Sequence, residues 1–190
     1  MVVVPIRRIA ITGETVLHQP ALTVAEITLE IKELVSDMFD TMTAAPGVGL
    51  AATQVGVGLR IFVYDYEQDE IHYRGVAINP TLEVGEILDL QADEDTDSEG
   101  CLSIPGERYP LKRSDTATLH ATDLAGSPYT IAATGWLARI FQHEYDHLDG
   151  VLYADRLIKP YQRELKKVYK YEGWGVPGQS WMPGEDDLEA

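Results

Sequence analysis

Phe141 to Gly150 reads F-Q-H-E-Y-D-H-L-D-G and combines two histidines with a glutamate at the spacing of a metal-binding helix. On a helix, His143 and His147 are four residues apart, so both imidazoles lie on one face and can reach the same ion. Glu144 points to one side of that face, where its carboxylate can accept a proton from a water molecule. A catalytic divalent ion needs a third protein ligand, which must come from elsewhere in the chain.

The composition limits the fold and the class of partner. A length of 190 residues and a hydrophobic fraction of 45% are typical of one globular domain with a sizeable core. A net charge of -16 argues against binding to DNA or another polyanion over a broad surface. Cys101 is the only cysteine and fits a reducing compartment. No apolar run has the length of a membrane span or the flanking charges of a signal peptide, so we expect a cytoplasmic protein without membrane contact.

The hydrophobic periodicity predicts both helices and strands. A helix is expected over residues 24–43, begun by a capping box of Thr23 and Glu26. Further helices are expected from about Thr134 or Gly135 through the histidines, and over residues 160–171. Short strands are predicted over residues 60–64, 76–79, 82–87, 116–122 and 128–133. We therefore expect an α+β fold, in which short antiparallel strands pack around a central metal-binding helix, with an N-terminal and a C-terminal helix.

Three segments lack a clear periodicity. Residues 7–22 are expected to be irregular, and most of the acidic run over residues 83–99 to form a solvated loop, because like charges resist compaction. The end of the run differs, because Glu99 begins the segment that carries Cys101. The tail over residues 172–190 is rich in Gly, Pro and acidic residues and is expected to be irregular and extended. The predicted organisation is thus a single catalytic domain over residues 1–171 followed by this tail.

A glycine-rich segment, G-V-G-L-A-A-T-Q, occupies residues 47–54. Its glycines allow the backbone to pass close either to another element or to a ligand, and the pattern alone does not separate these two uses. It lacks the Gly-Lys-Ser/Thr of a phosphate-binding loop. Its last residue, Gln54, carries a side-chain amide that can donate to a developing negative oxygen.

The third ligand has several candidates. In the zinc-endopeptidase pattern the third histidine would fall at Tyr153, and tyrosine is a poor substitute. A downstream glutamate, Glu164 or Glu172, is the alternative in another peptidase scheme. Cys101 lies in E-G-C-L-S over residues 99–103, and a thiolate is a strong ligand, although a lone cysteine is more often a small buried hydrophobe. Besides an endopeptidase, a protein with a purely structural metal also stays open.

Taken together, G-V-G-L-A-A-T-Q, E-G-C-L-S and Q-H-E-Y-D-H, in this order, resemble the bacterial peptide deformylases. The resemblance covers roughly residues 5 to 170. It implies that Cys101, His143 and His147 hold one divalent metal. The family's ion is ferrous iron, while Zn²⁺, Ni²⁺ or Co²⁺ are alternatives in a purified sample.

The same resemblance implies the reaction and its catalytic groups. The enzyme would remove the formyl group from N-formyl-methionyl nascent peptides and release formate. Glu144 would act as the general base, and the side chain of Gln54 and the backbone N–H of Leu102 would stabilise the oxyanion.

The resemblance also implies a substrate site. The backbone at Val48 and Gly49 would pair with the extended peptide, and Val48, Trp136 and Ile140 would line the methionine pocket. Arg108 is expected to contact the substrate main chain. Arg139 departs from the family pattern, in which an apolar residue is common at that position.

Two further roles are expected for basic residues. Arg113 is a candidate partner for Glu99, which would steady the cysteine loop. The basic helix over residues 159–170 is expected either to make weak contact with the ribosome or to be a solvated helix that packs its tyrosines inward.

Overall fold

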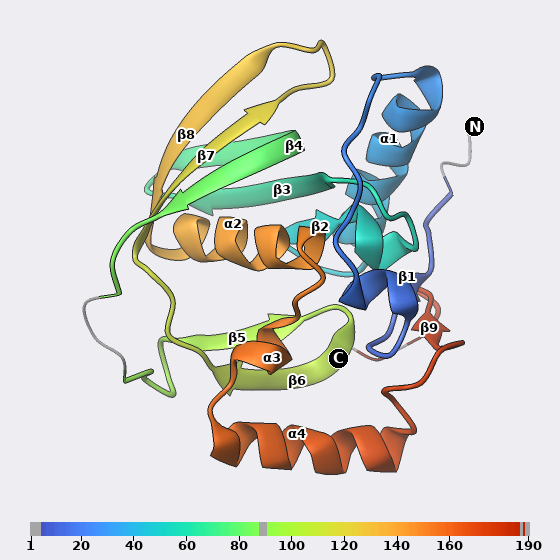
Figure 1. Ribbon diagram of the computed structural model, residues 1–190, viewed down its shortest axis with the longest axis vertical. Helices are drawn as coiled ribbons and strands as arrows, with labels where there is room; N and C mark the ends of the chain where they lie inside the picture. Colours follow the sequence, from blue (N-terminus) through green and yellow to red (C-terminus); the bar gives the residue numbers. More distant parts are fainter. Residues whose placement is uncertain (1–4, 88–90, 187, 189–190) are drawn as a thin grey trace.

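Helix α2 (Gly135–Leu148) lies between a five-stranded antiparallel sheet and a two-stranded hairpin (Figure 1). This computed structural model describes residues 5–87, 91–186 and 188. The sheet has the order β2 (Gly49–Ala51), β3 (Ile61–Gln68), β4 (Ile71–Val84), β7 (Thr116–Thr122) and β8 (Pro128–Thr134), and the hairpin consists of β5 (Ser98–Cys101) and β6 (Ile104–Pro110). The α+β prediction, with antiparallel strands around a central helix, is confirmed.

Helix α2 is buried on both sides. Leu137, Phe141 and Leu148 pack against the sheet in a core that includes Phe62 and Leu119. On the opposite side, His143 and His147 lie close to Cys101 of the hairpin. The helix begins directly after β8, as the sequence predicted. Because both faces are covered, polar groups on the hairpin side are removed from bulk water.

Two strands that the sequence predicted separately form one. Residues 76–79 and 82–84 both belong to β4, which has a change of register between Ile78 and Thr81. The second predicted strand was too long, because β4 ends at Val84 and not at residue 87. Asn79 has a positive φ of 49° at this point and is followed by Pro80, so the sequence there has the appearance of a turn. The strand pair β7 and β8 is confirmed almost to the residue.

The predicted start of the first helix was wrong. Helix α1 spans Leu29–Ala44, and the hydroxyl of Thr28 caps it by accepting the N–H of Ile31. The side chain of Asn79 binds both backbone groups of Val24, at 2.8 Å each. Residue 24 is therefore tied to the sheet and cannot enter the helix.

The two ends of the chain contain more structure than the sequence indicated. The N-terminal segment forms β1 (Ile9–Ala10) and the short helix η1 (Thr15–His18), and the tail forms β9 (Ser180–Trp181), which pairs antiparallel with β1. Residues 187, 189 and 190 of the tail, and residues 88–90 of the acidic run, lie outside the described residues.

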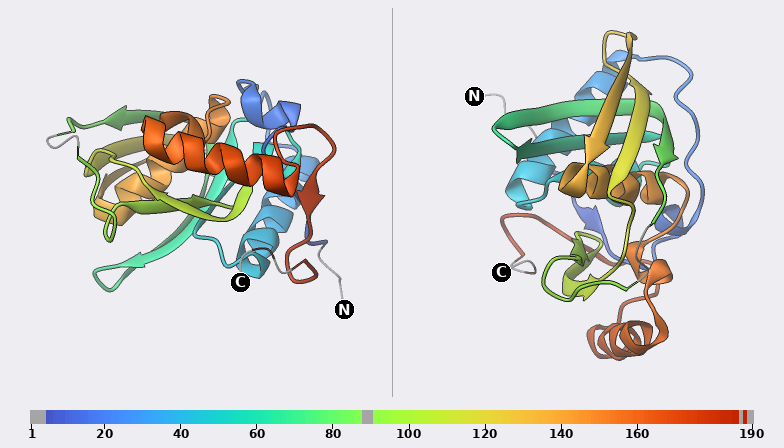
Figure 2. Two further views of the ribbon diagram at one scale, coloured as in Figure 1. Left: turned by 90° about the horizontal axis from the view of Figure 1, so that it is seen from below. Right: turned by 90° about the vertical axis from the view of Figure 1, so that its left-hand side faces the viewer.

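Three short or peripheral helices complete the chain: η2 (Ala52–Val55), α3 (Tyr153–Arg156) and α4 (Lys159–Glu172). Figure 2 shows α4 on the outer side of the hairpin, where Leu165 is buried and the ring of Tyr161 packs on Tyr109. Within the described ranges, none of the helices has the length and apolar character that a bilayer crossing requires.

Candidate metal centre

Cys101, His143 and His147 meet in the interior between α2 and the hairpin. Helix α2 presents both histidines one turn apart, and Cys101 stands at the end of β5, where the hairpin register shifts. The Cys101 Sγ is 3.4 Å from Nε2 of His147, which is 3.2 Å from Nε2 of His143. The three ligand atoms all lie within 4.8 Å of one another, and all three residues are buried.

This geometry fits a metal ion. Bonds of about 2.0 Å to nitrogen and 2.3 Å to sulfur around a tetrahedral centre place two nitrogens roughly 3.3 Å apart and a sulfur and a nitrogen roughly 3.6 Å apart. The observed separations of 3.2 and 3.4 Å are close to these values. A set of one thiolate and two imidazoles leaves a fourth position open, which is typical of catalytic sites. The triad therefore implies a divalent metal.

The charges around His143 also suit a cation. Burial opposes a charge on this imidazole, but the neighbouring Cys101 and Glu99 raise the pKa of His143 well above its usual value. Burial, followed by the charge on His143, lowers the pKa of His147, so that His147 is neutral and its ring nitrogen is free to bind a metal. A site that favours a proton on His143 favours a metal cation for the same reason.

Glu99 orients His143 from behind. Its Oε1 is 2.6 Å from Nδ1 of His143, which leaves Nε2 directed at the other two ligands. Arg113 binds both oxygens of Glu99, at 2.7 and 2.8 Å, so the predicted pair of Arg113 and Glu99 is confirmed. Although burial disfavours the carboxylate, Arg113 holds the pKa of Glu99 well below its usual range.

Arg113 extends this support back to α2. Its Nη1 donates to Asp146 at 2.9 Å, and Asp146 also accepts two hydrogen bonds of 2.6 Å from Arg156. The role of Asp146 was missed in the sequence. Its position between the two histidines was the available signal.

Glu144 lies against the glycine-rich segment and is only 4% exposed. Burial raises the pKa of Glu144 to about 7. Its Oε2 has no hydrogen-bond partner among the described residues, although the atom is buried. A Cβ on Gly49 would lie 2.4 Å from its Oε1, so Gly49 must be glycine for this carboxylate to fit. The glycine-rich segment therefore serves close packing at this residue.

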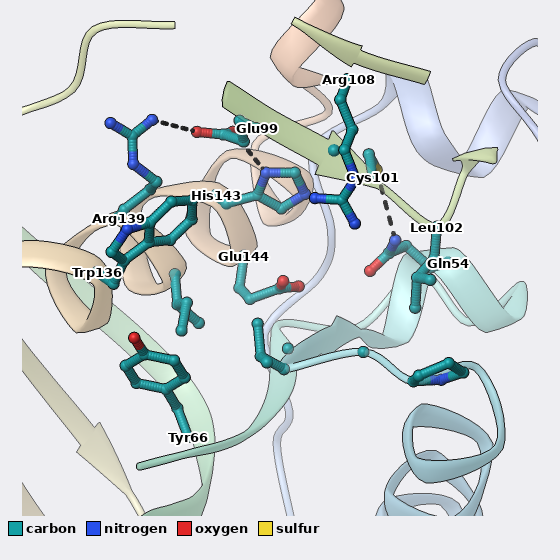
Figure 3. Close-up of a pocket in the computed structure, with 16 residues that line it drawn as sticks. Gln54, Tyr66, Glu99, Cys101, Leu102, Arg108, Trp136, Arg139, His143 and Glu144 are labelled. Atoms are coloured by element: carbon teal, nitrogen blue, oxygen red, sulfur yellow. Dashed lines mark hydrogen bonds and ion pairs between the residues drawn. The ribbon is translucent and has the colours of Figure 1, made fainter. Parts of the chain in front are cut away.

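Gln54 belongs to η2, and its side chain reaches Cys101 and Ser103. Its Oε1 accepts the N–H of Ala51 at 2.9 Å, and its Nε2 lies 3.7 Å from the Cys101 Sγ and 3.4 Å from Oγ of Ser103. The carbonyl end of the amide is thus held by backbone, and the donor end faces the site. Figure 3 shows Gln54 and Leu102 together on the side of the pocket toward which Glu144 points.

A pocket of about 380 Å³ opens beside these groups. Its lining includes every residue that the sequence assigned to the substrate, namely Val48, Gly49, Arg108, Trp136 and Ile140. Val48 and Trp136 are 43% and 41% exposed, so they form the rim. Tyr66 on β3 also lines the pocket and was missed, because a tyrosine in a strand carries no local signal of a site (Figure 3).

Arg139 forms a second buried ionic contact that the sequence did not predict. It donates to Asp97 Oδ1 at 2.6 Å, to Glu99 Oε2 at 3.1 Å and to the carbonyl of Leu111 at 2.7 Å. Its guanidinium also lies over the ring of Trp136, 5.0 Å from the centroid. Asp97 and Glu99, at the end of the acidic run, are therefore buried, so the predicted solvated loop ends before Asp97.

The alternative third ligands do not reach the centre. Glu164 and Glu172 are exposed on α4, and neither belongs to the cluster. Tyr153 is buried, stacks on His143 with ring centroids 6.3 Å apart, and donates its hydroxyl to the carbonyl of Glu107. Its role at this site is packing.

Comparisons with known proteins agree with this geometry. Residues 6–163 match the family model of polypeptide deformylase. A peptide deformylase of Mycolicibacterium paratuberculosis is 50% identical over 193 aligned positions, covering 97% of this chain and 96% of the relative. One of Tropheryma whipplei is 50% identical over 188 positions, covering 93% of each.

Solved structures give the same result. A peptide deformylase of Ehrlichia chaffeensis superposes with a TM-score of 0.75 at 32% identity, covering 88% of this chain and 97% of that one. One of Synechococcus elongatus, solved in complex with actinonin, has a TM-score of 0.75 at 35% identity, covering 94% of this chain and 93% of that one.

Proposed function

Because this chain belongs to the polypeptide deformylase family, and is thus a metallohydrolase with peptide deformylase activity, we propose how its own residues carry the reaction. The substrates are polypeptides with an N-terminal formyl-methionine, and the products are formate and a free amine. The observation that carries the proposal is that one buried centre joins Cys101, His143 and His147, with the Glu144 carboxylate beside it. We place the activity in the cytoplasm, where nascent chains are made.

The metal is proposed to be Fe²⁺. Zn²⁺, Ni²⁺ or Co²⁺ are expected to occupy the same ligands in some purified samples, because one thiolate and two imidazoles accept several borderline ions. When bound, the ion supplies a water molecule of lowered pKa and polarises the carbonyl that is attacked. All other steps are assigned to groups of the chain.

Glu144 is proposed to move the proton. It accepts a proton from the water that attacks the formyl carbon, and then donates this proton to the amine nitrogen as the C–N bond breaks. A pKa of about 7, caused first by burial, suits a group that must both accept and donate near neutral pH. The absence of a side chain at Gly49 leaves the space that this carboxylate occupies.

Gln54 and Leu102 are proposed to stabilise the oxyanion. The Gln54 amide nitrogen and the Leu102 backbone N–H would donate to the formyl oxygen as negative charge develops on it. The hydrogen bond from Ala51 fixes the Gln54 amide in advance, so little reorganisation is needed during the reaction. Removal of such a donor typically costs about 3 kcal/mol of barrier.

The substrate is proposed to enter along the free edge of β2. The main chain of Val48 and Gly49 would pair with the extended peptide, and pairing of this kind is nearly independent of side-chain identity. Val48, Trp136 and Ile140 would enclose the methionine side chain. Arg108, which lines the same pocket, would contact the substrate main chain.

A weak contact with the ribosome is proposed for α4. Its Lys159, Arg163, Lys166, Lys167 and Lys170 are all exposed, whereas Leu165 packs inward. This basic stripe on an acidic protein suits ribosomal RNA. At low salt, the wild type and the control variant Lys32→Ala, on α1, should sediment with ribosomes. The double variant Lys166→Ala/Lys167→Ala should stay in the supernatant. The proposal fails if the wild type does not pellet or if all three proteins pellet equally.

The decisive test of the catalytic proposal is formate release from a formyl-Met peptide by anaerobically purified protein, with metal content measured on the same sample. Wild type should release formate, and Glu144→Ala should keep the metal and lose turnover. A variant that keeps both metal and turnover would show that Glu144 is not the general base. A wild type that binds metal but releases no formate would point to a structural metal. Cleavage of internal peptide bonds in place of deformylation would indicate an endopeptidase.

A further inference from the structure

The tail of the chain contacts the backbone of Leu102, next to Cys101, through Trp181. This tryptophan is only 2% exposed, and its indole Nε1–H donates to the carbonyl oxygen of Leu102 at 2.8 Å. Trp181 lies beyond residue 163, where the match to the family model ends. A contact with the loop next to Cys101 therefore comes from a segment outside the matched residues.

The tail is fixed where this contact is made. Trp181 pairs with Ile9 in the two-stranded sheet of β1 and β9, which lie side by side in Figure 1. The Glu14 carboxylate accepts the backbone N–H groups of Gly178 and Gln179. The tail also fits tightly against Gly13, because a Cβ there would meet the backbone of Val176 at 2.3 Å. These contacts hold the indole in a single position.

A second hydrogen bond holds the same loop from the N-terminal segment. The N–H of Thr12 donates to the carbonyl of Ser103 at 2.8 Å, and the carbonyl of Thr12 accepts the N–H of Gly175 at 3.0 Å. The carbonyls of Leu102 and Ser103, the two residues between β5 and β6, are thus both held by the joined ends of the chain. A backbone held in this way has little freedom to rotate at Leu102.

We propose that Trp181 is a positioning residue for catalysis, which acts by fixing the Leu102 backbone so that its N–H points at the substrate oxygen. This inference rests on the proposed role of Leu102 as an oxyanion donor. Such donors are effective because they are oriented before the reaction starts. Trp181 is not among the residues that line the described pocket, so it is proposed to act through Leu102, which does line it.

The test compares Trp181→Phe with Trp174→Phe. Phe keeps an aromatic ring but removes the indole donor, and Trp174 is a matched control because it is a partly buried tryptophan of the same tail that packs on the core. For a formyl-Met peptide we expect Trp181→Phe to lower kcat about tenfold, with KM and metal content unchanged. Trp174→Phe should match the wild type.

A measurement that does not depend on turnover tests the role of Trp181 independently of the proposed function. Hydrogen exchange of the Leu102 amide, followed by NMR, should be about tenfold faster in Trp181→Phe than in Trp174→Phe. If the wild type releases no formate from the substrate, the proposed function fails. The exchange rate of the Leu102 amide then decides alone whether Trp181 orders the backbone there. The inference is overturned if kcat and exchange are unchanged, or if the loss is confined to KM or metal content.

A second variant covers the case in which Trp181→Phe does not fold. Glu14→Gln weakens the anchor of the tail without altering the indole, the loop or the core. We expect a two- to threefold lower kcat with unchanged KM and metal content. Wild-type kcat in Glu14→Gln would then overturn the inference.

Discussion

The Glu99 carboxylate lies 2.6 Å from the Nδ1 of His143, on the side of the ring that faces away from the other metal ligands. Arg113 and Arg139 both bind this carboxylate, so its negative charge is balanced within the protein interior. Glu99 therefore fixes the tautomer of the imidazole and keeps its Nε2 available to a metal.

Replacing Glu99 by Gln should weaken metal binding by roughly 10- to 100-fold, because the neutral amide supports His143 less well. The check is metal content after dialysis against a competing chelator. Asp93→Asn is the control, since Asp93 is an exposed acid of the same segment. Equal retention by both variants and the wild type would show that Glu99 does not support the ligand.

Cys101→Ala should abolish stoichiometric metal binding, because two imidazoles alone rarely hold a catalytic ion. Glu164→Ala and Glu172→Ala should keep the metal, since both glutamates are exposed on α4. Metal analysis of the three purified variants makes the comparison. Metal loss in a glutamate variant with retention in Cys101→Ala would overturn the ligand assignment.

The sequence predicted the two histidines from a local signal, because histidines four residues apart share a face of any helix. Cys101 was one of several candidate ligands from the residues alone, and its assignment came from the resemblance to the peptide deformylases. The buried ion pairs were not predictable in this way. Asp97 lies in an acidic run that has the composition of a solvated loop, and only the fold brings it to Arg139, 42 residues further along.

The errors in the predicted helices and strands also arise from contacts between segments that are distant in the sequence. Thr23 and Glu26 form a sound local capping pattern, but the side chain of Asn79 holds Val24 in the extended segment before α1. Pairing of β9 with β1 joins residues at opposite ends of the chain, and the short strands carry no periodicity of their own. Contacts between distant segments decide these features, and a single sequence does not display them.

Gly49→Ala should lower kcat roughly 100-fold while metal is retained, because the new Cβ would displace the Glu144 carboxylate. The control is Gly58→Ala, where an added Cβ meets only a side-chain carbon of Val16 at an ordinary 3.8 Å. Formate release and metal content are measured on both variants. Full activity of Gly49→Ala would show that the position of Glu144 does not limit the reaction.

Arg139→Leu should lower the free energy of unfolding by about 3 kcal/mol, because it leaves Asp97 and Glu99 with fewer cationic partners in the interior. Lys112 and Arg113 remain beside these carboxylates and limit the loss. Urea unfolding of the variant measures the change, with Arg163→Leu on the exposed face of α4 expected within about 0.5 kcal/mol of the wild type. If Arg139→Leu is neutral or stabilising, the cost of burying these charges equals or exceeds their mutual attraction. The remaining role of Arg139 would then be its contact with Trp136 at the pocket rim.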